Sequence, residues 1–285
     1  MTSKVDQKLQ TQLNQAAKAF NEINDYHAVR PKYTIESADY LLKQVRVLSR
    51  DNNVIGDSAT ILELGSGTGL FTSSALEVLK GFSNVRYIVT DPLECMEEAI
   101  AKFLPNVEFM LCKAENIPLP DNSVRAILAA TSYHWFANQQ AFTEMYRVLE
   151  PKGMLGYITN MPSATDSPQW MLDAYKLLQQ SYEKTKAPFV HDRKWQKALH
   201  SSNLFNDYQS HLHLRSFQKL NQSQCIKYFS LFGGVAAGSE KHRQNFERQI
   251  DELLRNYFSD QRREFKGIEH TVEIYTSQSK KEPLK

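Results

Sequence analysis

A glycine-rich turn between a buried strand and a helix limits the possible folds of this chain more than any other feature. Residues 59–64 (ATILEL) have the apolar character of a strand, and GSGTGLFTSSAL follows, with Gly65, Gly67 and Gly69 in its first five residues. Glycine lets the backbone approach a bound molecule closely, and the N-terminus of the following helix presents free amide groups. A turn of this kind is typical of an α/β sheet that binds a nucleotide-like ligand at the carboxyl ends of its strands.

The rest of the chain continues the alternation of strand and helix. We expect buried strands in five short apolar runs, at residues 59–64, 85–90, 107–111, 124–130 and 154–159. Strand-like alternation returns at residues 208–217 and 267–276. Helical windows occupy much of the remainder, at residues 5–24, 41–48, 169–185, 193–200, 221–232 and 239–257. This alternation predicts an α/β fold whose mostly parallel sheet is covered by helices on both faces.

The length of 285 residues fits either one large domain or two average ones. Because α/β folds of about 200 to 250 residues commonly form one domain, we predict a single domain over residues 1–285. Within it we expect four parts: an N-terminal helical cap (1–53), a ligand-binding core (54–160), a helical insertion (161–203), and C-terminal strands and helices that complete the sheet (204–285).

Charge and composition exclude several classes of protein. With 34 basic and 32 acidic residues the net charge is +2, which supplies no general attraction to nucleic acid or to anionic lipid. No window approaches the roughly 18 consecutive apolar residues of a membrane span. The three cysteines, Cys95, Cys112 and Cys225, form no CxxC motif, which argues against a disulfide framework and a thiolate zinc site. We predict a cytoplasmic protein without a nucleic-acid or membrane partner, and its oligomeric state stays open.

Two acidic residues near the turn distinguish between candidate ligands. Glu63 stands two residues before the first glycine, where its carboxylate suits the ammonium group of an amino-acid-bearing cofactor and would repel a pyrophosphate. Leu70 occupies the place of the third glycine in the dinucleotide fingerprint, so a nicotinamide cofactor fits less well. Asp91 ends the second strand, 22 residues after Gly69, the interval at which an acidic residue binds ribose hydroxyls.

Four segments together resemble the consecutive motifs of the class I S-adenosylmethionine-dependent methyltransferases (methyltransferase type 11 superfamily). They are ILELGSGTGLFT, VTDPLECM, KAENIPLPDNSVRAILAATSYHWF and MYRVLEPKGMLGYIT. The resemblance runs from about Phe20 to Asn160, and its Ala-Glu-x-x-Pro-Leu-Pro-Asp block and His-Trp-Phe are most similar to the trans-aconitate and related small-molecule carboxylate methyltransferases. It implies a Rossmann-like, doubly wound sheet of seven strands with an antiparallel last strand, and S-adenosyl-L-methionine as the cofactor.

The resemblance also implies a set of cofactor-binding residues. Glu63 and the glycines would hold the methionine moiety, Asp91 the ribose, and Ala114 with Glu115 the adenine. The full predicted set is Glu63, Gly65, Ser66, Gly67, Gly69, Asp91, Pro92, Ala114, Glu115, Tyr26 and Thr131. This chain departs from the family at two positions, where Lys113 and Arg125 stand in place of aspartates, and the effect of these changes on binding or activity stays open.

His134 is the predicted catalytic residue. It follows the strand at residues 124–130, so its imidazole lies at the ligand-binding edge, where it can donate a hydrogen bond to a carboxylate or act as a general base. The other interpretation is a histidine packed in a loop with Trp135 as a core residue. In YHAVRPKY, which resembles the N-terminal motif of the same family, Arg30 suits a carboxylate. The predicted acceptor-binding set is Arg30, Tyr33, Tyr133, His134 and Trp135, and aromatic residues of the caps, Tyr26, Trp170, Tyr175 and Trp195, are expected to line an apolar pocket.

The leading functional prediction is methyl transfer to a small-molecule acceptor, at an oxygen of a carboxylic acid. A carboxylate is already deprotonated at pH 7, whereas a phenol or an amine would need a base. No metal is expected, because His211 and His213 lack a third ligand at suitable spacing. The alternatives are a cofactor-binding protein without turnover, an N- or S-methyltransferase and, more remotely, a nicotinamide-dependent oxidoreductase or a nucleic-acid methyltransferase.

Overall fold

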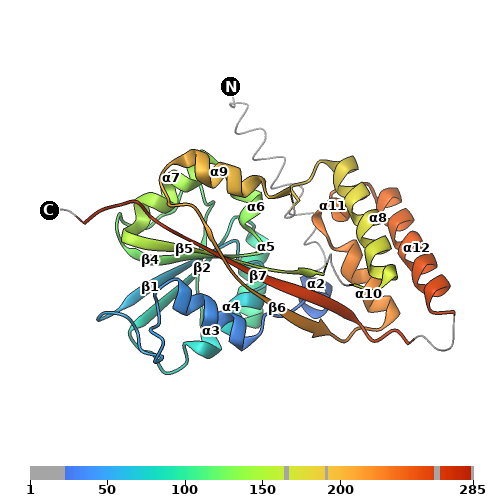
Figure 1. Ribbon diagram of the computed structural model, residues 1–285, viewed down its shortest axis with the longest axis horizontal. Helices are drawn as coiled ribbons and strands as arrows, with labels where there is room; N and C mark the ends of the chain where they lie inside the picture. The colour runs from blue at the N-terminus through green and yellow to red at the C-terminus, as the bar shows by residue number, and fades with distance from the viewer. Residues whose placement is uncertain (1–22, 164–166, 190–191, 260–263, 284–285) are drawn as a thin grey trace. The chain divides into compact units, whose positions relative to one another are not determined.

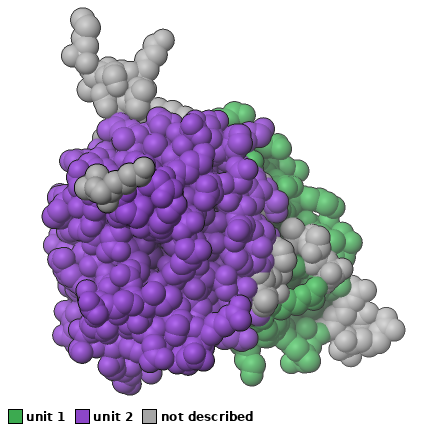
Figure 2. All heavy atoms as spheres, turned by 60° about the vertical axis from the view of Figure 1, so that its left-hand side comes forward, with its two compact units in different colours: residues 1–31, 161–192, 215–271 green, residues 32–160, 193–214, 272–285 purple. Residues whose placement is uncertain are grey.

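The computed structural model describes residues 23–163, 167–189, 192–259 and 264–283 (Figure 1). The helix predicted over residues 5–24 lies outside the described residues except for its last two, which begin α2 (Ile23–Val29). The chain divides into two compact units (Figure 2). Unit 1 comprises residues 1–31, 161–192 and 215–271, and unit 2 comprises residues 32–160, 193–214 and 272–285. The two helices of the predicted insertion fall in different units.

The central sheet has seven strands in the described part of the chain, in the order β3-β2-β1-β4-β5-β7-β6. Their bounds are β1 (Ala59–Leu64), β2 (Val85–Asp91), β3 (Glu108–Leu111), β4 (Val124–Ala130), β5 (Leu149–Pro162), β6 (Gln209–Gln218) and β7 (Ile268–Gln278). The first five strands of this order, β3-β2-β1-β4-β5, pair in parallel with their neighbours. Along β7 the pairing runs in reverse, because the Ser279 amide bonds Gly153 whereas the Ser163 amide bonds Glu269. The mostly parallel, Rossmann-like sheet with an antiparallel strand is therefore confirmed.

Helices cover both faces of the sheet in unit 2. On one face lie α3 (Ile35–Gln44), α4 (Leu70–Val78) and α5 (Glu94–Phe103), and on the other lie α7 (Gln139–Val148) and α9 (Lys194–Ser202), with the single turn α6 (Tyr133–Phe136) after β4 (Figure 1). Thr34 and Asn138 cap α3 and α7 by accepting hydrogen bonds from backbone amides of the first turn. The apolar sides of α3 and α4 form one core with β1, β2 and β4.

Unit 1 is mostly helical. It contains α2, α8 (Gln169–Thr185), α10 (Gln222–Ser230), α11 (Gly233–Ala236) and α12 (Glu240–Tyr257). A capping box of Asn221 and Gln224 begins α10. Gly234 lets α11 approach α8, since a Cβ there would lie 2.5 Å from the ring of Tyr182. Among the described residues, no helix is long and apolar enough to cross a membrane.

Candidate functional site

The glycine turn after β1 has one position that opens to empty space. Gly65, Gly67 and Gly69 all have positive φ, at 67°, 55° and 80°. A Cβ on Gly65 would lie 2.8 Å from Ser132, so this glycine is needed for packing against the segment after β4. A Cβ on Gly67 would meet nothing within 4 Å. The space beside the backbone of Gly67 is therefore open.

Asp91 lies next to this open position, at the carboxyl end of β2. Its Oδ2 accepts a hydrogen bond from the Gly67 amide and its Oδ1 accepts one from the Leu93 amide, both at 3.1 Å. The side chain is only 6% exposed, and burial raises the pKa of Asp91 to about 6, although both hydrogen bonds act to lower it. Asp91 thus lies at the end of the second strand, next to the glycine turn, and its role as a ribose ligand stays a prediction.

Glu63 is a fully buried carboxylate near the end of β1. Its Oε2 accepts hydrogen bonds from the hydroxyl groups of Thr72 and Tyr87, each at 2.8 Å. Its Oε1 has no hydrogen-bond partner within the described ranges. Burial, followed by the charge of Asp91, raises the pKa of Glu63 to about 7 in spite of the two hydroxyl donors.

Glu115, which the resemblance places beside the adenine, bonds to the start of α7. Its Oε1 accepts a hydrogen bond from the Asn138 side chain at 2.7 Å, and its backbone carbonyl accepts one from Gln140 at 3.4 Å. Of the two residues that depart from the family, Lys113 forms an isolated antiparallel β-bridge with Asn116 through the backbone. Arg125 bonds the backbone of Ile55 and pairs with Glu150 at 3.5 Å.

The segment after β4 holds a strained residue. Thr131 has φ +51°, an uncommon conformation for a β-branched side chain. Three hydrogen bonds hold it there: its amide donates to Ile158, its hydroxyl bonds the Tyr33 hydroxyl at 2.7 Å, and that same hydroxyl oxygen accepts from the Asn160 amide at 3.3 Å. Two predicted residues, Tyr33 and Thr131, thus meet directly, at the carboxyl ends of β4 and β5.

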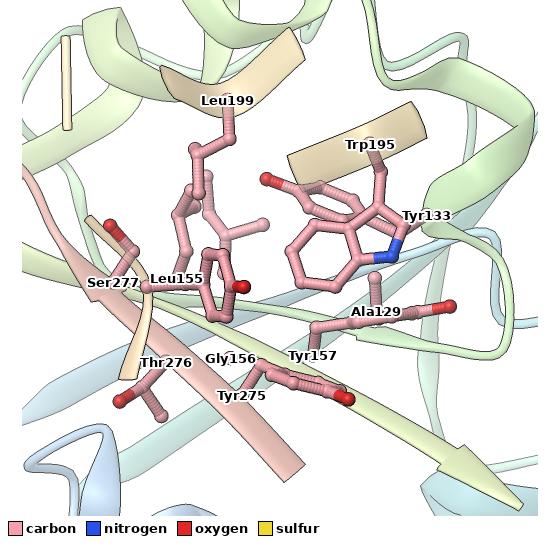
Figure 3. Close-up of a pocket in the computed structure, with 12 residues that line it drawn as sticks. Ala129, Tyr133, Leu155, Gly156, Tyr157, Trp195, Leu199, Tyr275, Thr276 and Ser277 are labelled. Atoms are coloured by element: carbon pink, nitrogen blue, oxygen red, sulfur yellow. The ribbon is translucent and has the colours of Figure 1, made fainter. Parts of the chain in front are cut away.

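The three aromatic residues of α6 have different surroundings. His134 and Trp135 are half-buried, with ring centroids 5.5 Å apart. Tyr133 is buried and packs against Tyr157 and Trp195, whose ring centroids lie 5.3 and 5.7 Å away. In Figure 3 these rings and Tyr275 surround a cavity of about 10 Å³, roughly the space for one water molecule. Tyr133 and Trp195 thus belong to a packed aromatic cluster in unit 2.

Tyr26 and Arg30 belong to unit 1, where Arg30 lies among aromatic rings. The guanidinium carbon of Arg30 lies 4.2 Å from the ring centroid of Phe232, 5.3 Å from that of Tyr228 and 5.5 Å from that of Tyr26. Tyr228 also shares a 3.0 Å hydrogen bond with the fully buried His270. Burial, and then the charge of Arg30, lowers the pKa of His270 to about 3.

The aromatic residues predicted to line one acceptor pocket have separate neighbours. Trp170 packs on Phe258 and Phe265 in unit 1. Tyr175, on the same helix, contacts Phe189. Trp195 packs on Tyr133 and Tyr157 in unit 2. Three residues that the sequence did not single out, Thr72, Tyr87 and Asn160, instead contact the predicted site residues Glu63 and Thr131.

Comparison with known proteins finds similarity to methyltransferases. Residues 61–153 match a family model described as a methyltransferase domain. An uncharacterized methyltransferase-like protein of Schizosaccharomyces pombe is 36% identical over 175 residues, which cover 61% of this chain and 62% of the relative. A demethylmenaquinone methyltransferase of Chlamydia trachomatis is 30% identical over 125 residues, which cover 42% of this chain and 52% of the relative. The chain thus matches between half and two thirds of the length of these curated relatives.

A solved structure extends the likeness to nearly the whole chain. The structure of a putative type II methyltransferase from Anaeromyxobacter dehalogenans has a TM-score of 0.60 at 19% identity, and the match covers 90% of this chain and 99% of that one. The segment matched by the family model contains the glycine turn, Glu63, Asp91 and His134. The chain therefore shares the fold of this solved methyltransferase structure, and its residues 61–153 match a methyltransferase domain.

Proposed function

We propose that this protein transfers the methyl group of S-adenosyl-L-methionine to a small-molecule acceptor. The observation that carries the proposal is the open space at Gly67 beside the Asp91 carboxylate. The residues present fit this cofactor, because a buried carboxylate oxygen of Glu63 lacks a donor among the described residues and the cofactor carries an ammonium group. When bound, S-adenosyl-L-methionine supplies a methyl group already activated on a sulfonium.

Each residue of the site then has a defined task. Asp91 accepts hydrogen bonds from the ribose hydroxyls, Gly67 gives the ligand access to the backbone, and Glu63 receives the ammonium group. Ala114 and Glu115 lie beside the adenine. The protein needs no nucleophile of its own, since its contribution is to hold the acceptor close and in line with the methyl group and to exclude water.

We propose a carboxylate oxygen as the acceptor atom. The Ala-Glu-x-x-Pro-Leu-Pro-Asp and His-Trp-Phe motifs resemble those of the carboxylate methyltransferases, and His134 follows β4 at the ligand-binding edge of the sheet. His134 donates a hydrogen bond that orients the carboxylate. A ring acceptor is the second candidate, because the demethylmenaquinone methyltransferase is 30% identical over 125 residues; it would require His134 as a base.

Two matched glycine variants test the cofactor site. Gly67 and Gly81 both have positive φ, and a Cβ on either would meet nothing within 4 Å. Gly67→Ala and Gly81→Ala should therefore each reduce stability by about 1 kcal/mol. Only Gly67→Ala should weaken binding of S-adenosylhomocysteine, by about tenfold or more, as measured by calorimetry. Equal affinity in the two variants would contradict the placement of the cofactor, and absence of heat in the wild type would refute the function.

Turnover is tested with isotope-labelled S-adenosylmethionine and a panel of carboxylic acids, phenols, quinols, thiols and amines, read by mass spectrometry of the products. The proposal expects label on a carboxylate oxygen. Label on a ring carbon or ring oxygen would favour the second candidate. Cofactor binding without label on any compound would favour a protein that binds the cofactor without turnover.

A further inference from the structure

We propose that Thr72 and Tyr87 are positioning residues of the cofactor site. Their hydroxyl groups occupy one oxygen of Glu63 and reserve the other for the ammonium group of the cofactor, which displaces a proton when it binds. This inference rests on the proposed function, and it adds two residues and a proton exchange that the function alone does not require.

The two hydroxyl groups reach Glu63 from different elements. Thr72 lies in the first turn of α4, directly after the glycine turn. Tyr87 lies on β2 and is paired in register with Ile61, so it shares a sheet face with Ile61 and Glu63. Both side chains bind the same oxygen, Oε2, at 2.8 Å. Burial, and then the charge of Glu63, raises the pKa of Tyr87 well above its usual value, so Tyr87 acts as a neutral donor.

This geometry decides where a proton on Glu63 resides. Because Oε2 already accepts two hydrogen atoms, the acid form of Glu63 carries its proton on Oε1. Oε1 is also the oxygen without a partner in the described part of the chain. The proton and the ammonium group of a ligand therefore compete for one atom, and binding of the ligand releases the proton.

The charges around Glu63 favour this exchange. In the described part of the chain, three groups face it: the Thr72 hydroxyl from α4, and the Tyr87 hydroxyl and the Asp91 carboxylate from β2. The neighbouring residue on β4, Leu128, is apolar. Neither carboxylate forms an ion pair with a described residue. Among the described residues the site thus holds two buried carboxylates and no cation, and the ligand supplies one. With a pKa of about 7, Glu63 is about half protonated at pH 7 when the ligand is absent.

Calorimetry with S-adenosylhomocysteine in two buffers of different ionisation enthalpy measures the proton exchange. We expect the wild type to release about half a proton per ligand at pH 7. Glu63→Gln should remove the contribution of Glu63 to this release, because glutamine does not titrate. Comparing the wild type with Glu63→Gln at each pH from 5.5 to 8 removes the contributions of the amino group of the ligand and of Asp91. The affinity of the wild type should rise with pH and level off above the pKa of Glu63.

Variants of the two hydroxyl residues test the positioning role. Tyr87→Phe and Thr72→Val each remove a donor that stabilises the carboxylate form. Each should shift the midpoint of the affinity–pH curve upward by up to about one pH unit. Thr72→Ser keeps the hydroxyl group and should restore the midpoint of the wild type. Ser74→Ala is the matched control, because Ser74 is a buried hydroxyl residue of the same helix that bonds the carbonyl of Tyr33 instead.

The outcomes are distinct. Ligand binding without proton release in the wild type, or loss of affinity in Tyr87→Phe and Thr72→Val that is uniform across pH, would overturn this inference and leave the proposed function standing. Absence of ligand binding in the wild type at every pH would refute the function itself. Unfolding midpoints measured by circular dichroism show whether each variant is folded. If Thr72→Val does not fold, the comparison of Thr72→Ser and Tyr87→Phe with the wild type still tests the inference.

Discussion

His134 is the residue whose substitution separates the two acceptor classes. If the acceptor is a carboxylate, His134→Gln keeps a donor and should retain a measurable kcat. The kcat of His134→Ala should fall further, by about 10- to 150-fold, because a hydrogen bond to a charged oxygen contributes about 1.5 to 3 kcal/mol. If His134 is a base for a ring hydroxyl, the kcat of both variants should fall by about a hundredfold or more. His200→Gln is the control, since His200 is an exposed histidine that pairs with Asp207.

At the residue scale, sequence spacing predicted where an acidic side chain stands. Asp91 was expected at the end of the second strand, and the structure places it there with its carboxylate on the Gly67 amide, while its role in ribose binding stays a prediction. The contacts of Thr72 and Tyr87 with Glu63 were not predictable in this way. They depend on strand register and on the direction of α4, which single-sequence periodicity does not determine. The left-handed conformation of Thr131 likewise follows from hydrogen bonds to distant residues.

At the scale of elements, α3 packs closely on the sheet at a glycine of β5. A Cβ on Gly156 would lie 2.7 Å from Val45, 2.8 Å from Leu128 and 2.9 Å from Leu41. Gly156→Ala should therefore overpack this core and destabilise the protein by about 1 to 3 kcal/mol, measured as a lower urea midpoint. An unchanged midpoint would mean that α3 shifts away from β5 at little cost.

Apolar runs predicted the strands with differing success. The bounds of β1 and β4 agree with the sequence, because each is a mainly apolar run that is followed by a turn. By contrast, β5 extends over 149–162, well beyond the expected 154–159. Its first residues include charged side chains that no hydrophobic pattern marks as strand. They are extended because Leu149 pairs with Val124 across an irregularity in the register.

At the scale of the whole molecule, the chain passes repeatedly between two compact units. Residues 161–192 and 215–271 belong to unit 1, and residues 193–214 return to unit 2. The sequence predicts a helical insertion at 161–203 as one part, yet α8 and α9 lie in different units. No change in composition marks these crossings, because both units are built from amphipathic helices and share the long strands β5, β6 and β7.

Buried ionisable groups give the two units opposite pH dependence. In unit 2, burial raises the pKa of Glu63 from 4.5 to about 7 and that of Asp91 from 3.8 to about 6. The folded state therefore favours their acid forms, and this stability is present at low pH and is lost as pH rises through these values. In unit 1, the pKa of His270 falls from 6.5 to about 3. Its neutral form is favoured, so this stability is present above pH 6.5 and is lost as pH falls toward 3.

Hydrogen exchange at several pH values, corrected for intrinsic exchange rates, should resolve this opposition in the protein without ligand. Between pH 4.5 and 7, protection of β1 and β2 should decrease by an amount on the order of 3 kcal/mol from Glu63 alone, since one pKa unit corresponds to about 1.4 kcal/mol. Below pH 6.5, protection of α10 and the first residues of β7 should decrease instead. Glu63→Gln should weaken only the first trend, leaving the part that Asp91 contributes, and His270→Asn should flatten only the second. If protection in both units decreased as the pH rose, or in both as it fell, the buried carboxylates and the buried neutral histidine would not control the pH dependence of stability.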